Sequence, residues 1–240
     1  MKDKMLDNMR KRIARTIYKQ SLIAQGDRIL VGLSGGKDSF VLLDSLVDRK
    51  KYLPFNIEII ATHIHIKNVG YQSDLNYLEN ICRERNVEFF PIDFEIEKTE
   101  KTEKAMCFYC SWNRRKTLFK LTQEHHCNKL ALGHHMDDAV ETMLMNQLFH
   151  ASISSMPYKF SMFEKRIEVI RPLLDLRNSE ALKYACALNY QQQLKDCPYT
   201  NTKRESVRSI IDTMEKMNKT AVKNIFRSPK KIFSEYLPHK

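Results

Sequence analysis

The stretch Arg28-Ile-Leu-Val-Gly-Leu-Ser-Gly-Gly-Lys-Asp-Ser39 decides the fold of this chain. Its first half, Arg28–Leu33, is a short apolar run that predicts a buried strand. Its second half, Ser34–Ser39, is a glycine turn, and an apolar helix-like segment, Phe40–Val47, follows. Two glycines let the backbone turn tightly, and the helix after them points N–H groups and its positive dipole end at a ligand. The stretch therefore predicts a strand, an anion-binding turn and a helix in succession.

The side chains of the turn fit a pyrophosphate group. Lys37 adds a cation, and two serine hydroxyls add donors. Asp38 is unusual beside phosphates unless it holds Mg²⁺ or takes part in the chemistry. The turn lacks the four-residue spacer of G-x-x-x-x-G-K-[ST], the loop of the common phosphate-binding ATPases, and it also differs from the dinucleotide-binding pattern G-x-G-x-x-G. The expected phosphate-binding residues are Ser34, Gly35, Gly36, Lys37, Asp38 and Ser39.

Strand-like and helix-like segments alternate along the rest of the chain. The strand-like segments are Ile57–Ile66, Val87–Ile92, Lys129–Gly133 and Val169–Ile170. The helix-like segments are Ser73–Arg85, Cys110–Glu124 and Asp137–Phe149. Such alternation predicts an α/β fold with a Rossmann-like parallel sheet of about five strands in the order 3-2-1-4-5, with helices on both faces. An N-terminal helix and a C-terminal helical segment are added to it.

The net charge of +11 resides at the two ends of the chain. Residues 1–20 hold seven Lys/Arg and two Asp (+5), and residues 216–240 hold seven Lys/Arg and one Glu (+6), so the remainder is neutral. This distribution favours a polyanion held at the flanks of the protein, whereas the plainer reading is that terminal lysines keep the chain soluble. The candidate nucleic-acid contacts at the ends are Lys11, Arg15, Lys19, Lys230 and Lys231.

The N-terminal segment is an expected amphipathic helix. Apolar residues recur every four positions from Met5 to Ile17, and basic residues recur on the other side. The apolar stripe packs either on the same chain or on a second copy in a homodimer. Near the other end, a helical pattern fades after Lys219 into an expected loosely held basic tail.

Composition and the ends of the chain also set its class. Hydrophobic residues make up 42% and charged residues 29%, which excludes a disordered chain. No apolar run approaches the roughly 20 residues of a membrane helix, and the charged N-terminus has no signal-peptide core. We expect a cytoplasmic protein with reduced thiols and no membrane partner. Its expected segments are residues 1–26 (basic helix), 27–175 (core domain) and 176–240 (C-terminal helical segment with a basic tail).

Polar residues follow the strand at Lys129–Gly133. Gly133 and His134 end it, and Asp137 and Asp138 open the next helix. Ligands of doubly wound sheets bind at the carboxyl ends of strands, which favours a site here beside the glycine turn. Helix capping by the two aspartates is the alternative.

Three cysteines stand out among six. Cys107 and Cys110 form a C-x-x-C before a basic helix, and Cys197 lies in a polar stretch before a proline. A single C-x-x-C fits half a zinc site, half a cluster site, a redox pair or chance. Three thiolates suit a cubane cluster with one open iron better than a closed structural zinc site, although the sequence by itself leaves both open.

Together these motifs resemble one family. SGGKDS after a strand resembles the PP-loop of the N-type ATP pyrophosphatases, and the order of the motifs resembles the tRNA 2-thiocytidine synthetases, or tRNA-cytidine(32) 2-sulfurtransferases. The matching segments are Lys11–Arg15, Gly26–Leu30, Ser34–Ser39, Cys107–Ser111 with Arg114-Arg115, Ala131–His135 with Asp137-Asp138, Met156-Pro157, Ile170–Leu173 and Cys197.

The resemblance implies a reaction. ATP adenylates the C2 oxygen of an anticodon-loop cytidine in tRNA, and sulfur held on a [4Fe–4S] cluster replaces that oxygen, with AMP and pyrophosphate as products. The sulfur donor is a cysteine desulfurase or free sulfide. The cofactors are ATP, Mg²⁺ and the cluster, which maps onto Cys107, Cys110 and Cys197.

The resemblance also implies site residues. Further ATP contacts map onto His63, His65, Gly133, His134, Asp138 and Arg171. Candidate catalytic residues are Asp38, Asp137, Lys116 and Arg114, with Asp38 the candidate Mg²⁺ ligand. Arg115 joins the RNA contacts. Phe108, Tyr109 and Trp112 either stack on the target base or pack around the cluster.

The chain departs from the family pattern in places, and rival functions remain. His63-Ile-His65 stands where an acidic residue is expected, His150–Ser155 replaces glycines, and Thr200 replaces a cysteine. One rival is a lysidine synthetase-like ligase with a structural zinc. The other is a non-catalytic RNA-binding protein with a vestigial loop.

Overall fold

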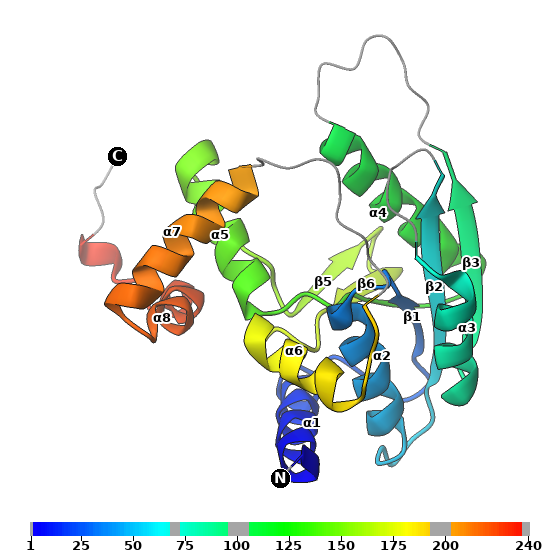
Figure 1. Ribbon diagram of the computed structural model, residues 1–240. Helices are drawn as coiled ribbons and strands as arrows, with labels where there is room; N and C mark the ends of the chain where they lie inside the picture. The colour runs from blue at the N-terminus through cyan, green and yellow to red at the C-terminus, as the bar shows by residue number, and fades with distance from the viewer. Residues whose placement is uncertain (1, 68–72, 96–105, 193–202, 237–240) are drawn as a thin grey trace. The chain divides into compact units, whose positions relative to one another are not determined.

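The computed structural model in Figure 1 describes residues 2–67, 73–95, 106–192 and 203–236, apart from the side chains of residues 106–108. The chain divides into two compact units. Unit 1 is Met1–His134 with Pro157–Thr200, and unit 2 is His135–Met156 with Asn201–Lys240. The division differs from the three segments expected from sequence, because a central helix packs with the C-terminal helices in unit 2.

A six-stranded sheet forms the centre of unit 1. Its strands are β1 (Arg28–Gly32), β2 (Glu58–Ile66), β3 (Glu88–Phe94), β4 (Lys129–Ala131), β5 (Lys159–Met162) and β6 (Ile167–Ile170). The order is β3-β2-β1-β4-β6-β5, and every pair is parallel except β5 with β6. The predicted order 3-2-1-4-5 is confirmed for the five parallel strands, with β6 as the fifth. Sequence missed β5, an edge strand with mostly exposed residues that lacks an apolar run.

Helices cover both faces of this sheet, as predicted. The helices of unit 1 are α1 (Lys2–Lys19), α2 (Lys37–Lys50), α3 (Leu75–Glu84), α4 (Met106–Glu124) and α6 (Asn178–Ala187). One core cluster joins α1, α2, α3 and α6 to one face, and a second joins α4 to the other (Figure 1). Strands buried on both faces read as continuous apolar runs, which explains why β1 and β2 were clear in the sequence.

The apolar stripe of α1 packs within unit 1. Leu6, Met9, Ile13 and Ile17 are buried in the same cluster as the β1 side chains. Of the two alternatives left by the sequence, the stripe therefore lies on the body of its own chain. The basic residues Lys11, Arg15 and Lys19 on the other side of α1 are exposed.

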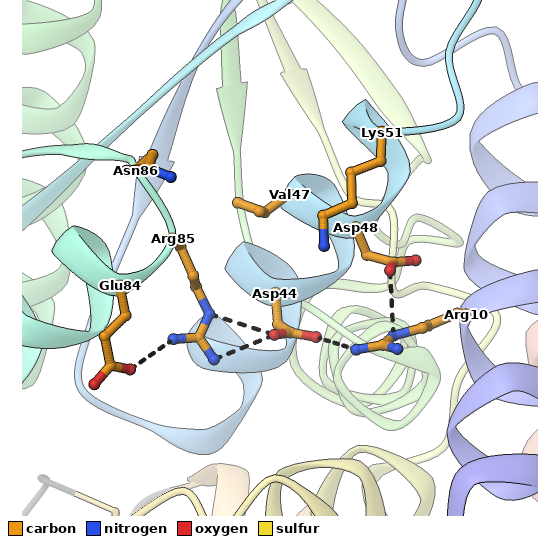
Figure 2. A pocket seen from close by; sticks show the side chains of 8 residues that line it. All are labelled: Arg10, Asp44, Val47, Asp48, Lys51, Glu84, Arg85 and Asn86. Atoms are coloured by element: carbon orange, nitrogen blue, oxygen red, sulfur yellow. Dashed lines mark hydrogen bonds and ion pairs between the residues drawn. The ribbon is translucent and has the colours of Figure 1, made fainter.

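A charged network ties α1 to α2, α3 and α6, and Figure 2 shows the part of it that joins Arg10, Asp44 and Arg85. Buried Asp44 of α2 accepts hydrogen bonds from Arg10 at 3.1 Å, from Arg85 at 3.2 and 3.3 Å, and from the Tyr184 hydroxyl at 2.8 Å. Burial alone would lower the pKa of Arg10, but the hydrogen bonds to Tyr184 and Asp44 raise it overall. These charged side chains line a pocket of about 370 Å³, and opposite charges pair around it. We interpret the network as a structural clamp between the helices.

Unit 2 is helical. It contains α5 (Met136–His150), α7 (Lys203–Met217) and α8 (Ala221–Arg227), then short 3-10 turns at Ser228–Lys230 and Ser234–Tyr236. A small core of its own includes Val140, Ile211 and Val222. The helical pattern, which was expected to fade between Lys219 and the basic tail Arg227–Lys231, resumes in α8 as far as Arg227. Val222 of α8 is fully buried. A helix of seven residues with a single fully buried side chain shows too little hydrophobic periodicity to be recognised in the sequence.

None of the helices in the described ranges is long and apolar enough to cross a membrane.

Candidate functional site

The predicted glycine turn links β1 to α2. Gly35 adopts φ +82°, the left-handed conformation that glycine reaches without steric cost. Gly36 is the N-cap of α2, so no side chain of the cap residue blocks the first turn of the helix. A left-handed turn that leads into a helix N-terminus presents backbone N–H groups to an anion. The backbone of this turn therefore has the form that phosphate binding requires.

Two serine hydroxyls hold the turn in shape. The hydroxyl of buried Ser39 accepts hydrogen bonds from the Ser34 N–H and hydroxyl, both at 3.1 Å, and donates to the Gly36 carbonyl at 2.8 Å. The Gly36 N–H donates to Ser34 Oγ at 3.3 Å. Sequence predicted these hydroxyls as ligand donors. In the structure they first serve to fix the loop conformation.

Lys37 and Asp38 form an ion pair at the start of α2. Lys37 Nζ lies 2.9 and 2.7 Å from the two carboxylate oxygens of Asp38. Since a Mg²⁺ ion would compete with this ammonium group for the same oxygens, binding of Mg²⁺ by Asp38 requires Lys37 to turn toward the phosphates. The role of Asp38 as a metal ligand stays a prediction.

The loop after β4 lies against the turn. A Cβ atom added to Gly133 would lie 2.8 Å from the Asp38 carbonyl oxygen and 3.1 Å from the Ser39 nitrogen. Because β4 pairs with β1, their carboxyl ends meet at one edge of the sheet. Only glycine allows this approach of two backbones. The half-buried His134 follows directly.

Tyr190 holds the turn from the other side, and sequence analysis missed it. Its hydroxyl donates a 2.8 Å hydrogen bond to the Gly35 carbonyl, and its ring stacks on Phe40 at 4.1 Å between centroids. Burial raises the pKa of Tyr190, which keeps the hydroxyl protonated as a donor. The residue stands in the polar stretch Asn189–Gln193, 155 positions from its partner, and no local pattern in the sequence marks it.

Two histidines lie on β2 at the same edge. His63 is buried, and its Nδ1 lies 2.7 Å from the Leu33 carbonyl at the end of β1. Burial, followed by the nearby charges of Arg114 and His65, lowers the pKa of His63, so it is neutral at pH 7. The Nδ1–H then donates to the carbonyl. His63 thus fixes the end of β1 immediately before the turn.

His65 carries a buried nitrogen with no partner among the described residues. Its Nδ1 lies 3.0 Å from the Asp93 carboxylate, while no described residue forms a hydrogen bond with Nε2. Hydrogen bonds from His65 and Lys67 lower the pKa of Asp93. Because the carboxylate only accepts, Nδ1 carries a proton in this contact, and Nε2 is left available to a ligand. A buried polar nitrogen of this kind fits a hydrogen-bonding group on a bound ligand.

Arg171 is a cation without a described counter-charge. It follows β6, and its Nη1 donates to the Pro157 carbonyl at 2.8 Å, while the buried Nε has no hydrogen-bond partner within the described ranges. Burial lowers the pKa of Arg171, and no carboxylate of the described residues forms an ion pair with it. A half-buried guanidinium left in this state is stabilised by an anion.

The two aspartates of α5 belong to unit 2, and Asp138 forms a capping box with the N-cap residue His135. The His135 N–H donates to Asp138 Oδ2 at 2.9 Å, and the Asp138 N–H reaches His135 Nδ1 at 3.4 Å. Asp137 lies in the same first turn. Capping, one of the two readings of the sequence, is therefore present for Asp138. Participation of Asp137 and Asp138 in an active site stays a prediction.

The basic residues of α4 separate onto different sides of the helix. Arg114 is half-buried, and its charge acts on His63. Arg115 and Lys116 are exposed, and Lys116 Nζ lies 5.2 Å from the centre of the Trp112 ring. The predicted catalytic residues Arg114 and Lys116 thus lie on different sides of α4. In unit 2, Lys230 and Lys231 are exposed.

The predicted cluster ligands are mostly outside the described part of the chain. The Cys107 side chain and Cys197 are not described, and Cys110 is half-buried in α4. Within the described ranges, no group of three or more His, Cys, Asp or Glu side chains could hold a metal ion. The three-cysteine site is therefore a prediction that rests on sequence.

Comparison with known proteins identifies the class. The PP-loop domain family matches residues 5–214, and the chain belongs to that family. It is 30% identical over 247 residues to the tRNA-cytidine(32) 2-sulfurtransferase of Geotalea uraniireducens, covering 99% of this chain and 96% of that protein. It is 33% identical to the protein of the same name from Francisella tularensis subsp. mediasiatica, covering 91% of this chain and 83% of the relative.

Solved structures share the fold. The U34-tRNA thiolase NcsA from Methanococcus maripaludis with its [4Fe–4S] cluster superimposes with a TM-score of 0.81 at 24% identity, covering 99% of this chain and 81% of that one. NMN synthetase from Francisella tularensis has a TM-score of 0.53 at 13% identity, covering 100% of this chain and 99% of that one. At these identities the likeness concerns architecture, and it confirms the predicted Rossmann-like PP-loop fold.

Proposed function

We propose that this protein is an ATP-dependent tRNA sulfurtransferase that replaces the C2 oxygen of an anticodon-loop cytidine with sulfur. The observation that carries the proposal is the β1–α2 turn, a preformed pyrophosphate cradle that Gly133 closes on one side. The names of the relatives at about 30% identity supply the substrate and the transferred atom.

The residues of unit 1 account for binding of the nucleotide. The turn and the N-terminus of α2 bind the β- and γ-phosphates, and Lys37 moves from Asp38 to these phosphates. Arg171 supplies a second cation, because its guanidinium has no described carboxylate partner. The Nε2 of His65, which has no partner among the described residues, forms a hydrogen bond with the adenine base.

The reaction follows from where the charges form. The C2 oxygen of the cytidine attacks the α-phosphate, the α–β bond breaks, and pyrophosphate leaves into the turn. The oxygen, now esterified to AMP, is a good leaving group, so a sulfur nucleophile that bonds to C2 expels AMP with the electron pair of the C–O bond. Arg114, near neutral His63, stabilises the charge that develops on the phosphate. When the nucleophile is hydrosulfide (HS⁻), its proton must leave after sulfur bonds to C2, and Asp137 is the proposed acceptor of that proton.

Cys107, Cys110 and Cys197 are the proposed ligands of a [4Fe–4S] cluster. When bound, the cluster supplies the sulfur, which a cysteine desulfurase or free sulfide replenishes. Thiolate ligands and a tRNA substrate favour the cytoplasm as the site of the reaction.

Two measurements test the proposal. The first determines iron and acid-labile sulfide after anaerobic purification, and we expect about four of each per chain. Cys197→Ala should lose them. Cys186→Ala, which changes an exposed cysteine of α6, should retain them. Stoichiometric zinc without sulfide would contradict the cluster and favour the alternative function, a lysidine synthetase-like ligase with a structural zinc.

The second measurement is nucleoside analysis of tRNA after incubation with ATP and sulfide. We expect 2-thiocytidine together with AMP and pyrophosphate, and no product when ATP is omitted. Lys37→Ala should abolish all three products, because it removes the one lysine of the turn. AMP formation without any thiolated nucleoside would refute sulfur transfer.

A further inference from the structure

An open groove lies along the outer face of α4. It has a volume of about 530 Å³, and we call it the α4 groove. It lies between α4 and the turn that joins β5 to β6, all within unit 1. Its principal lining residues are Trp112, Arg115, Lys116, Phe119, Lys120 and Phe163.

The groove combines exposed aromatic rings with positive charge. Trp112 and Phe163 are each 47% exposed, although large rings usually bury most of their surface. Arg115, Lys116 and Lys120 supply three cations, and no carboxylate belongs to the described lining. Glu124 pairs with Lys120 at 3.4 Å from outside the lining, which leaves the groove with a net positive charge.

The rings are held in place by specific contacts. Lys116 Nζ lies 5.2 Å from the centre of the Trp112 ring, which is a cation–π distance. Phe119 meets Phe163 edge to face at 5.4 Å between centroids. These contacts restrict the rings before any ligand arrives, so less conformational entropy is lost when one binds.

The turn that carries Phe163 is strained. Phe163, Glu164 and Lys165 have φ values of +52°, +55° and +69°, and none of them is glycine. Successive non-glycine residues in the left-handed region are sterically unfavourable, and such strain persists mainly where it serves binding. Here the strained turn places an exposed phenylalanine at the rim of a basic groove.

From these observations we propose that the α4 groove binds an unpaired nucleotide of the RNA substrate, with its base stacked on Trp112 or Phe163 and its phosphates paired with Arg115 and Lys120. Aromatic platforms beside cations are how proteins hold single-stranded nucleic acid. A volume of this size suits one or two nucleotides. The inference rests on the proposed function, since it takes tRNA as the substrate.

This nucleotide is distinct from the cytidine that reacts. Arg114, whose charge acts on His63 at the nucleotide site, lies two residues from both Trp112 and Lys116 on α4. Two residues rotate a helix by about 200°, so these groups point away from Arg114. The groove therefore holds a neighbour of the target base. Lys116 is reassigned from the predicted catalysis to RNA binding.

The chain carries its own probe, because Trp112 is its only tryptophan. The full-length protein is titrated with fluorescein-labelled tRNA, and with a seven-nucleotide single-stranded RNA. Tryptophan emission and label anisotropy are recorded together. We expect saturable quenching of Trp112 with the same Kd as the anisotropy change for both RNAs.

Substitutions then test the energetics. Trp112→Ala should raise the Kd for tRNA at least about fivefold, as expected for loss of one stacked base. Trp112→Phe should restore most of the affinity. Tyr52→Ala, which removes an exposed aromatic ring outside the groove, is the matched control and should leave Kd unchanged. In thiolation assays, Trp112→Ala should raise KM for tRNA and leave kcat unchanged, and thermal melts should verify its folding.

Two results would overturn the inference, and they are distinguishable. If tRNA binds by anisotropy while Trp112 emission stays constant and Trp112→Ala keeps its Kd, the groove is not the RNA site and the proposed function stands. If the protein binds no tRNA at low salt, the proposed function fails and the groove assignment fails with it.

Discussion

Gly133→Ala tests whether the candidate nucleotide site depends on close contact between the loop after β4 and the β1–α2 turn. The added Cβ would lie 2.8 Å from the Asp38 carbonyl oxygen, about 0.6 Å inside the 3.4 Å at which ordinary contacts begin. The opposing atoms belong to backbone in the first turn of α2, which cannot rotate away as a flexible side chain can. The turn itself must therefore move.

Two magnitudes follow from that displacement. Overpacking of one methyl group costs about 1–3 kcal/mol of unfolding free energy. Misplacement of binding groups by up to 1 Å can cost about 10²-fold in rate, because the bound substrate no longer lies in reacting geometry. We therefore expect kcat/KM for ATP to fall by at least about tenfold, with a moderate loss of stability.

The assay is tRNA-dependent release of pyrophosphate, measured with ATP varied, alongside thermal unfolding. Gly32→Ala is the matched control. Gly32 ends β1, and its added Cβ would meet only leucine side chains at 3.4–3.7 Å, which is ordinary contact. If Gly133→Ala has the same KM for ATP and the same melting temperature as Gly32→Ala, the close approach does not shape the site.

Tyr190→Phe keeps the ring stacked on Phe40 and removes the hydrogen bond to the Gly35 carbonyl. We expect thermal melts to show about 1 kcal/mol less stability, and steady-state assays to show a raised KM for ATP. An unchanged KM would exclude a role for Tyr190 in shaping the turn. Asp44→Asn removes the buried negative charge that Arg10 and Arg85 share, so the free energy of unfolding measured in urea should fall by about 3 kcal/mol. A loss below about 1 kcal/mol, which is about a fivefold change in the folding equilibrium, would contradict the role of this network as a clamp between the helices. Because the pKa of His63 is lowered in the folded protein, the unfolded chain binds a proton more readily than the folded chain below the ordinary value of 6.5. The contribution of His63 to the free energy of unfolding is therefore complete above about pH 6.5. It falls by at most about 1.4 kcal/mol per pH unit as the pH drops toward the folded pKa. His63→Gln should flatten that slope in urea titrations between about pH 5 and 8, and an equal slope in both proteins would refute the assignment.

Local sequence determined the elements whose residues are neighbours in the chain. Arg28–Leu33 is apolar because β1 is covered on both faces, and Gly35 follows because the turn needs a positive φ. These causes act within a few residues, so they are readable without a structure. The same holds for α1, whose period separates a buried stripe from an exposed basic one.

Edge and terminal elements were less readable. β5 pairs with one neighbour and keeps most of its residues exposed, so it has no apolar run. α8 contributes one fully buried residue, Val222, whose partners lie in α5 and α7. Their stability comes from distant packing and not from propensity, which a local pattern cannot report.

By itself the sequence determined the β1–α2 turn, the strand order and the cysteines to test, because a strand, two glycines and a helix specify a phosphate site over twelve consecutive residues. Only the tertiary structure decided what surrounds that turn. It placed Tyr190 on the Gly35 carbonyl, Gly133 against Asp38, and Phe163 beside Phe119. Each of these contacts joins residues at least 44 positions apart, and loop closure, sheet register and core packing fix such pairs together.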